Sequence, residues 1–284
     1  MNLILFRLRL ALGLRDFRGA DLSNMNLSRY DLRNCRLAGA DLRNSILQGS
    51  NLEGQNLTGT NLRGADLRNA NMTSVACERT SLLRANLAGA NLQQADLRAQ
   101  DLRGTNLFGA DLAGCNLSDA RLDGIDLRRS NLSDALLWGA NLSGSNLLQA
   151  DLSRSNLDGA NLKGANLNRT NLTNAALCEA DLTEAKFWDA NLTDIKLGGA
   201  KLLGVKLDIT QLPSRIAAKF RIADRAQTQE QNQSQTRQAQ SQQRNPRPTQ
   251  QRQPPLPHQA PPPQNAQNHT QVNAQANHDR SQAR

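Results

Sequence analysis

The sequence predicts an all-β solenoid, in which the backbone winds into regular coils that stack along one axis. From Phe17 to Leu212 a central apolar residue, position i, recurs every five residues without a break in phase, and 36 of these 40 centres are leucine. Position i−2 is Ala, Ser, Thr, Cys or Val in 33 units, and position i−1 is Asp or Asn in 28. Seventeen of the 19 glycines fall at position i+2. A chain that repeats so strictly must bury each leucine in the same way.

A period of five residues excludes a flat strand and a straight helix. Side chains alternate faces along a strand, so an odd period would move the leucine to the opposite face in every unit. Five residues of helix advance by about 500°, which would spread the leucines around the surface. Burying them all requires a turn in each unit, and glycine at i+2 suits the positive φ of tight turns. We therefore expect leucines that point to the axis of coils paired about 4.8 Å apart.

The repeated A(D/N)LxG pattern, as in residues 85–89 (ANLAG), resembles the pentapeptide-repeat family over roughly residues 16–212. The resemblance implies a right-handed quadrilateral β-helix with four units per coil. Forty units then make about ten coils and a rod about 48 Å long, at ~4.8 Å per coil. The resemblance also implies a scaffold for protein interaction, a role that members often have. One branch of the family resembles DNA and inhibits DNA gyrase.

Four segments are predicted: an N-terminal cap at 1–15, the β-helix at 16–212, a C-terminal capping helix at 213–226 and a disordered tail at 227–284. The capping helix is expected from Ile216, Phe220 and Ala223, which share a helical face, with Ser214 as its N-cap. It could also support a homodimer. The tail is rich in Gln, Pro and Asn and has too few large apolar residues to fold.

The apolar and basic segment 1–15 is open to two structures and two roles. Alternate residues from Ile4 to Leu14 are large and apolar, which is typical of a strand, but Ile4, Leu5, Leu8 and Leu12 would also share one face of a helix. The favoured role is a cap over the open edge of the first coil. The alternative is a peripheral membrane anchor, which the three arginines of the segment favour.

The positive charge of the chain is concentrated at its ends. The net charge is +9, of which residues 1–15 contribute +3 and residues 213–284 contribute +7, so the repeat body carries −1. The four cysteines are too far apart for a metal motif and indicate reduced thiols, hence a cytoplasmic protein. No stretch approaches the 18 apolar residues that a membrane span needs.

The residues of the repeat predict no enzyme and no cofactor. All three histidines lie at or beyond His258, and no phosphate-binding loop is present. Asp and Asn at i−1 are interpreted as side chains that hydrogen-bond to nearby turns and to each other, rather than as an anionic stripe for a partner.

Apolar residues at outward positions are the best candidates for a partner site. Phe108, Leu148 and Trp188 fall in one outward column, two coils apart, and Trp138 is expected on the preceding face next to Leu136. Aromatic residues are favoured as interface anchors. The competing interpretation is scattered surface apolar residues, or contact with a terminal segment.

Basic residues at outward positions form a weaker candidate, a site for an anion. One predicted column holds Arg43, Arg63, Arg103 and Lys163, and the last coils carry lysines in place of Asp or Asn at Lys186, Lys196, Lys201 and Lys206. Such patches could bind an acidic protein or nucleic acid. Interleaved acids and scarce aromatics favour solvated faces instead, so nucleic acid is an unlikely partner.

The leading hypothesis is a non-enzymatic protein-interaction scaffold, a rigid rod that presents flat faces to an unknown protein. The first alternative, inhibition of gyrase by DNA mimicry, requires a strongly acidic rod, and the body charge of −1 argues against it. The second alternative is a membrane- or envelope-associated regulatory protein that uses residues 1–15.

Overall fold

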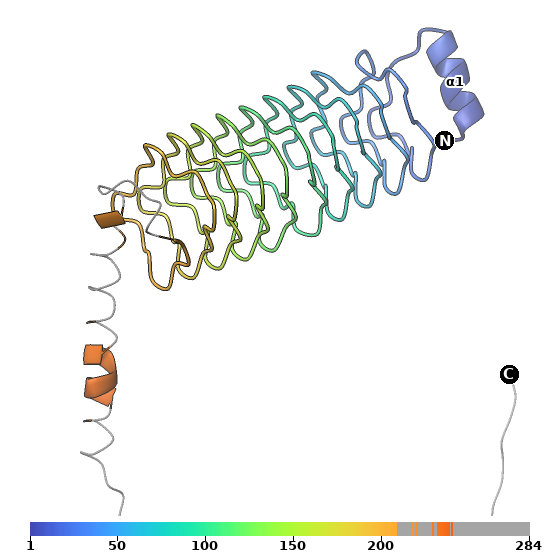
Figure 1. Cartoon of the computed structure of the whole chain (residues 1–284). Helices are drawn as coiled ribbons and strands as arrows, with labels where there is room; N and C mark the ends of the chain where they lie inside the picture. Colours follow the sequence, from blue (N-terminus) through green and yellow to red (C-terminus); the bar gives the residue numbers. More distant parts are fainter. Residues whose placement is uncertain (209–216, 219, 221–228, 230–231, 239, 241–284) are drawn as a thin grey trace, which may run out of the picture. The chain divides into compact units, whose positions relative to one another are not determined.

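The computed structural model describes residues 1–208, 217–218, 220, 229, 232–238 and 240 (Figure 1). The chain divides into two compact units, Met1–Thr236 and Arg237–Arg284. In the second unit only residues 237, 238 and 240 are described, and they are helical. The coils and the N-terminal helix therefore belong to the first unit.

Residues 16–206 form stacked coils joined by parallel pairing between residues 20 positions apart. The pairing involves position i−1 of each unit, from Asp16 with Arg36 to Lys186 with Lys206. Twenty residues comprise four five-residue units, so each coil has four sides, and Figure 1 shows the coils lying one on another. Each side contributes a single bridging residue, which is why the β structure consists of isolated bridges rather than long strands.

A turn closes every unit of the coil. The amide of residue i+3 donates to the carbonyl of residue i, as from Ala20 to Phe17 at 3.1 Å. Position i+2 has a positive φ in the described units except at Asn34, and glycine adopts this conformation, which a type II turn requires, freely, as at Gly39 with φ 70°. Other residue types take the same conformation where glycine is missing, as Arg154 does with φ 58°. The stacked coils on both sides therefore impose the turn even on residues that disfavour it.

The leucine centres fill the axis of the stack, as predicted. Those from Leu22 to Leu182 are at most 1% exposed, and the small i−2 residues lie beside them. Cys35, Cys77 and Cys115 are buried at inward positions, whereas Cys178 is partly exposed.

Asp and Asn at i−1 stabilise the turn that follows them. Their Oδ1 atom accepts a hydrogen bond from the backbone amide at i+1, as Asp151 does from Ser153 at 2.8 Å. Some also bond along the stack, as the Asn131 side-chain amide donates to the Asp111 carboxylate at 2.9 Å. These bonds support the structural interpretation of the repeated Asp and Asn.

The N-terminal segment contains a helix, α1 (Leu3–Ala11), so the strand that the alternating pattern suggested is wrong there. Asn2 caps α1 by accepting the Leu5 amide at 2.8 Å. Phe6 is fully buried, with its ring centroid 4.7 Å from that of Phe17 and 5.8 Å from that of Tyr30. Helix α1 thus packs on the first coil, which it adjoins in Figure 1.

Little of the predicted C-terminal segments is described. Residues 217, 218 and 220 are helical, and Phe220 belongs to the buried core. The predicted N-cap Ser214, the facing Ile216 and Ala223 and the proposed dimer contact through them lie outside the described residues. In the predicted tail 227–284, residues 229, 232–238 and 240 are helical, and the remainder lies outside the description.

Candidate interaction surface

Because residues 20 positions apart pair in successive coils, each outward residue can be assigned to one of four sides of the stack. We name each side by the residues at its i+1 positions. The aromatic side carries Phe108, Arg128, Leu148, Asn168 and Trp188. The next side along the chain, the polar side, carries Ala113, Ser133, Ser153, Thr173 and Thr193. The tryptophan side carries Ser118, Trp138, Asp158 and Cys178. The arginine side carries Arg43, Arg63, Leu83, Arg103, Asp123, Ser143 and Lys163.

The aromatic side presents large apolar surfaces from a fixed backbone. Phe108 is 37% exposed, Trp188 is 50% exposed, and Leu148 is half-buried. The guanidinium of Arg128 lies 5.4 Å from the centroid of the Phe108 ring, a cation–π arrangement. The same guanidinium contacts the carboxylate of Asp126 at 2.7 Å. Phe108 therefore adjoins an oriented cation, and the column continues through Leu148 to Trp188.

Trp138 does not join this column. Its unit is centred on Leu137, two units from Leu127 and from Leu147, so in a four-sided coil it lies on the opposite side of the stack. The expectation that Trp138 occupies the preceding face is therefore wrong. Trp138, 55% exposed, forms a separate small patch with Leu136, 44% exposed.

Arginines at i+1 are ion-paired within their own units wherever aspartate stands at i−1. Arg43 contacts Asp41 at 2.6 Å and Arg103 contacts Asp101 at 2.7 Å. The pairs of this kind are Asp16–Arg18, Asp31–Arg33, Asp41–Arg43, Asp66–Arg68, Asp96–Arg98, Asp101–Arg103 and Asp126–Arg128. Hydrogen bonds from Arg103 lower the pKa of Asp101 to about 2, so this carboxylate stays charged near neutral pH. The charges of these units are therefore matched locally as well as in number.

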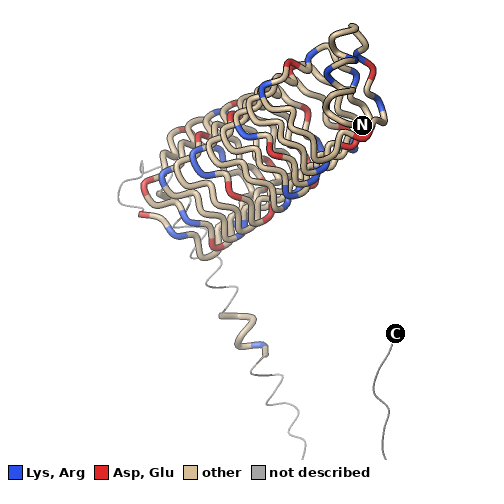
Figure 2. Tube along the Cα trace, turned by 90° about the vertical axis from the view of Figure 1, so that its right-hand side faces the viewer, with Lys and Arg blue, Asp and Glu red and all other residues tan. Residues whose placement is uncertain are grey.

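Two of the four residues of the predicted arginine column are therefore already ion-paired. Arg43 and Arg103 are committed to aspartates, and Leu83 and Asp123 interrupt the column. Arg63 and Lys163 follow asparagines at i−1 instead, and their backbone amides donate to those side chains. Figure 2 shows Lys and Arg interleaved with Asp and Glu along the coils.

The four lysines of the last coils surround the stack rather than gathering on one face. Lys186 and Lys206 pair on the aromatic side. Lys196 lies on the tryptophan side, stacked on Ala176, and Lys201 lies on the arginine side with its Nζ atom 3.7 Å from Asp181. All four are exposed. Two of them, Lys186 and Lys206, extend the aromatic side with positive charge next to Trp188.

Two places interrupt the otherwise continuous ladder of residues 16–206. The pairs Arg36 with Asn56 and Ser81 with Asp101 are missing from the series. Each gap directly follows a glutamine at i−2, Gln55 or Gln100, and no other unit has glutamine there. A glutamine is longer than the Ala, Ser or Thr that usually stands there, and the Gln55 side-chain amide donates to the Arg33 carbonyl of the preceding coil, so we attribute the two gaps to these side chains.

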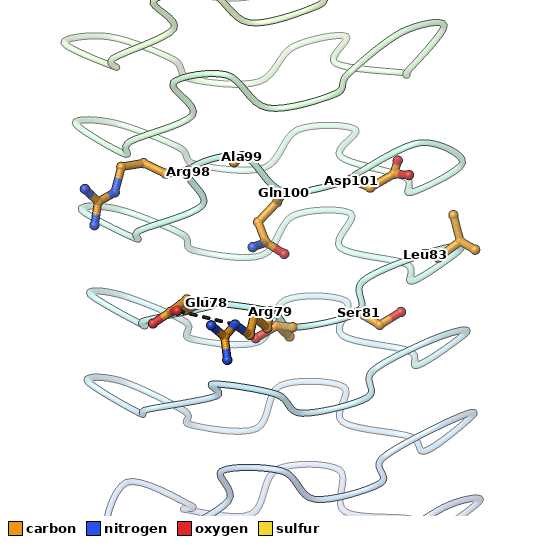
Figure 3. Close-up of a pocket in the computed structure, with 9 residues that line it drawn as sticks. Glu78, Arg79, Ser81, Leu83, Arg98, Ala99, Gln100 and Asp101 are labelled. Atoms are coloured by element: carbon orange, nitrogen blue, oxygen red, sulfur yellow. Dashed lines mark ion pairs between the residues drawn. The ribbon is translucent and has the colours of Figure 1, made fainter.

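The second gap opens a shallow depression, which sequence reasoning missed. Its lining is Glu78, Arg79, Thr80, Ser81, Leu83, Arg98, Ala99, Gln100 and Asp101. In Figure 3 the Gln100 side chain extends toward the coil that carries Glu78 and Arg79. The charged groups are already paired, Arg79 with Glu78 at 3.6 Å and Arg98 with Asp96 at 2.7 Å. The exceptional i−2 glutamines were the signal that could have predicted it.

The described residues show neither a metal cluster nor a reactive thiol at Cys77 or Cys115. They include no group of three His, Cys, Asp or Glu side chains that could hold a metal ion. Burial raises the pKa of the Cys77 and Cys115 thiols to about 12, so neither forms a thiolate near neutral pH. Across the part of the chain that is described, no helix is long and apolar enough to cross a membrane.

Comparison with known families identifies the repeat. The profile of pentapeptide repeats matches this chain in eight copies that together span residues 16–73 and 80–199. The chain therefore belongs to the pentapeptide-repeat family. The family fold is a right-handed quadrilateral β-helix, with which the four-sided coils agree.

Three solved structures illustrate the likeness. HetL, a pentapeptide repeat protein involved in heterocyst differentiation regulation in the cyanobacterium Nostoc sp. strain PCC 7120, is 33% identical. The match covers 72% of this chain and 96% of HetL, with a TM-score of 0.36. QnrB1, a plasmid-mediated fluoroquinolone resistance protein, is 22% identical over 69% of this chain and 93% of its own, with a TM-score of 0.28. A pentapeptide repeat protein of the Arabidopsis thaliana thylakoid lumen is 27% identical. The match covers 43% of this chain and 68% of that protein, with a TM-score of 0.21. No curated protein matches the chain.

Proposed function

We propose that the protein is a non-enzymatic interaction scaffold, a rigid rod of about ten coils whose aromatic side binds a protein partner. The observation that carries the proposal is the column of Phe108, Leu148 and Trp188, which stands exposed or half-exposed on a backbone that needs none of these side chains for its ladder. Aromatic residues of this kind supply large apolar contact area with few rotatable bonds.

The dimensions of the aromatic side suit a protein. Phe108 and Trp188 are four coils apart, about 19 Å at ~4.8 Å per coil, a distance that lies within the footprint of a standard interface. Arg128 lies between Phe108 and Leu148, and Lys186 lies beside Trp188. We therefore expect the partner to present an apolar ridge with carboxylates beside it. A preformed face loses little conformational freedom on binding, which favours affinity.

Capture with variants of single sides tests this proposal. Purified protein is coupled to beads in three forms: wild type, the triple variant Phe108→Ser/Leu148→Ser/Trp188→Ser, and the control Leu136→Ser/Trp138→Ser. A partner bound by wild type and the control, and lost from the triple variant, supports docking on the aromatic side. Equal recovery by all three forms contradicts it. Thermal unfolding of each form checks that the variants are as stable as wild type, so that a loss of binding reflects the changed surface.

Inhibition of gyrase by DNA mimicry ranks below the scaffold, because the aspartates of the rod are neutralised by arginines of the same units. A supercoiling assay with the purified protein tests this ranking, and potent inhibition would reverse it. The four free cysteines fit a reducing compartment, and on that ground we place the protein in the cytoplasm.

A further inference from the structure

Helix α1 has two apolar faces, only one of which the fold uses. The inner face is buried through Phe6, with Met1, Leu3 and Leu10 partly buried against the core. The outer face consists of large side chains that touch solvent: Ile4 is 78% exposed, Leu12 65%, Leu8 53% and Leu5 47%. Leu14, just after the helix, is 50% exposed. If the segment formed a helix, the sequence predicted that Ile4, Leu5, Leu8 and Leu12 would share one face. They do, but this face points away from the coils.

This outer face is concentrated in a very short segment. Ile4, Leu8 and Leu12 lie one helical turn apart, and Leu5 lies beside them, so they form one continuous stripe. Elsewhere in the described residues the exposed large apolar side chains are Ile46, Phe108, Leu136, Trp138 and Trp188, spread along the aromatic and tryptophan sides of the long stack. A continuous apolar stripe that is exposed to solvent indicates a binding role.

The helix is held rigidly without the outer face. The Arg7 Nε atom donates to the Tyr30 hydroxyl at 2.6 Å, and the Arg9 guanidinium donates to the Asp16 carbonyl at 2.9 Å while lying 5.2 Å from the Phe17 ring centroid. The N-terminal amine donates to the Asp21 carbonyl at 2.8 Å. Because the inner contacts fix the helix, the outer stripe is preformed and requires no folding on binding.

The charge around the stripe is positive. Residues 1–15 contain Arg7, Arg9, Arg15 and the terminal amine but no Asp or Glu. The first carboxylate that follows, Asp16, contacts Arg18 at 2.6 Å and Arg36 at 3.9 Å, so it offers no free negative charge. An occupant of this end should therefore be apolar at its centre and anionic around it.

We infer that the outer face of α1 docks on the surface of an anionic lipid bilayer. A bilayer surface combines acyl chains, which accept the stripe, with negative headgroups, which attract the arginines. Nine helical residues extend only about 14 Å at 1.5 Å per residue, too short to cross the hydrocarbon core, so α1 lies in the interface. A second copy of this chain fits less well, because pairing two such ends brings the arginines of both copies together.

Sedimentation with vesicles tests the inference on the full chain. Vesicles of phosphatidylcholine alone are compared with vesicles containing about one third phosphatidylserine. We expect wild type to bind the anionic vesicles and Ile4→Gln/Leu8→Gln/Leu12→Gln to bind them about tenfold more weakly or worse. Leu136→Gln/Trp138→Gln, which removes exposed apolar side chains elsewhere, is the matched control and should bind within about twofold of wild type.

The basic C-terminal segment makes the triple variant decisive. Residues 213–284 carry a charge of +7 and could attract anionic vesicles by themselves. If the triple variant binds as tightly as wild type, the inference is wrong and charge alone explains the binding. If instead wild type forms dimers in the ultracentrifuge without lipid and the triple variant does not, the stripe serves a second copy.

Two further measurements guard against trivial outcomes. Circular dichroism and urea unfolding should be the same for the triple variant and wild type, since Phe6 and its contacts are unchanged. Should the triple variant fail to fold, Ile4→Gln alone changes the most exposed residue of the stripe and should still weaken binding about threefold. The vesicle assay contains no protein partner, so its failure leaves the proposed docking on the aromatic side untouched.

Discussion

The aromatic side and the polar side are neighbours in every coil and share the same frame, yet their outward residues differ completely. In the coils compared, leucine stands at every centre except Phe187, position i−2 is small except at Ile125, and the turns of both sides have a positive φ at i+2. At i+1 one side carries Phe108, Leu148 and Trp188, whereas the other carries only alanine and hydroxyl residues in the same coils. The repeat therefore determines the frame and leaves the outward positions open to selection for binding.

The frame tolerates outward exceptions because it can replace a lost hydrogen bond. At Trp188 the usual acceptor at i−1 is missing, since Lys186 stands there, and the amide donates instead to Asn168 of the preceding coil at 2.9 Å. Cys178 does the same with Asp158 at 2.7 Å, because Ala176 stands at its i−1 position. A side can thus change its surface chemistry while its turns remain satisfied.

The largest effect is expected when the shared frame is damaged on either side. Leu147→Ala on the aromatic side and Leu152→Ala on the polar side each remove a fully buried side chain. Each should lower the free energy of unfolding by about 2–5 kcal/mol, the usual loss for a buried leucine with little room to collapse. Urea unfolding measures both values. A difference between them of more than about 2 kcal/mol would break the claim that the two sides have equivalent frames.

A smaller effect is expected at position i−2, where glutamine precedes each of the two interrupted ladder pairs. Ala120→Gln places glutamine before the intact pair of Asp101 with Arg121 and should destabilise the protein by about 1–3 kcal/mol through overpacking. The reciprocal Gln100→Ala should allow Ser81 and Asp101 to pair. Hydrogen exchange at the Arg121 amide, which now donates to the Gln100 carbonyl at 2.9 Å, should accelerate in the first variant. The glutamines do not cause the gaps if exchange at the Arg121 amide is unchanged in Ala120→Gln and the Asp101 amide gains no protection in Gln100→Ala.

A still smaller effect concerns the ion pair of the aromatic side. Hydrogen bonds from Arg128 lower the pKa of Asp126 below its usual value. Because the folded-state pKa is the lower one, the pair stabilises the protein above the unfolded pKa of about 3.9, and this stabilisation is lost as pH falls through the folded value. Arg128→Ala should raise the pKa of Asp126, which a carbon-detected NMR titration of the carboxylate measures. An unshifted titration in this variant would show that the pair does not form in solution.

Much of the frame could be predicted from the sequence because the same physical requirement recurs in every unit. The uninterrupted leucine period required buried centres, and the glycines at i+2 required turns. The two glutamines at i−2 were visible as well, but their consequence depends on how little space separates stacked coils, which only three-dimensional packing reveals.

The surface was harder to predict than the frame. The pairing of Asp41 with Arg43 inside one unit was missed, because sequence reasoning grouped arginines by column and not with the aspartate two residues earlier. Trp138 was placed on the wrong side although four units per coil already put its unit two units away from the column of Phe108. At the N-terminus, an alternating apolar pattern agreed with both strand and helix, and Asn2 capping with the burial of Phe6 decides for the helix.

The smallest effect on stability is expected at Trp188, the most exposed residue of the proposed docking surface. Trp188→Ser should change the free energy of unfolding by no more than about 0.5 kcal/mol, as should Thr193→Ser on the polar side, because both side chains lie outside the core. Thermal and urea unfolding of the two variants provide the comparison. A tryptophan kept half-exposed without a contribution to folding needs another reason to be there, and binding is one. If Trp188→Ser instead costs more than about 1 kcal/mol, the side chain supports the end of the stack, and the docking surface shrinks to Phe108 and Leu148.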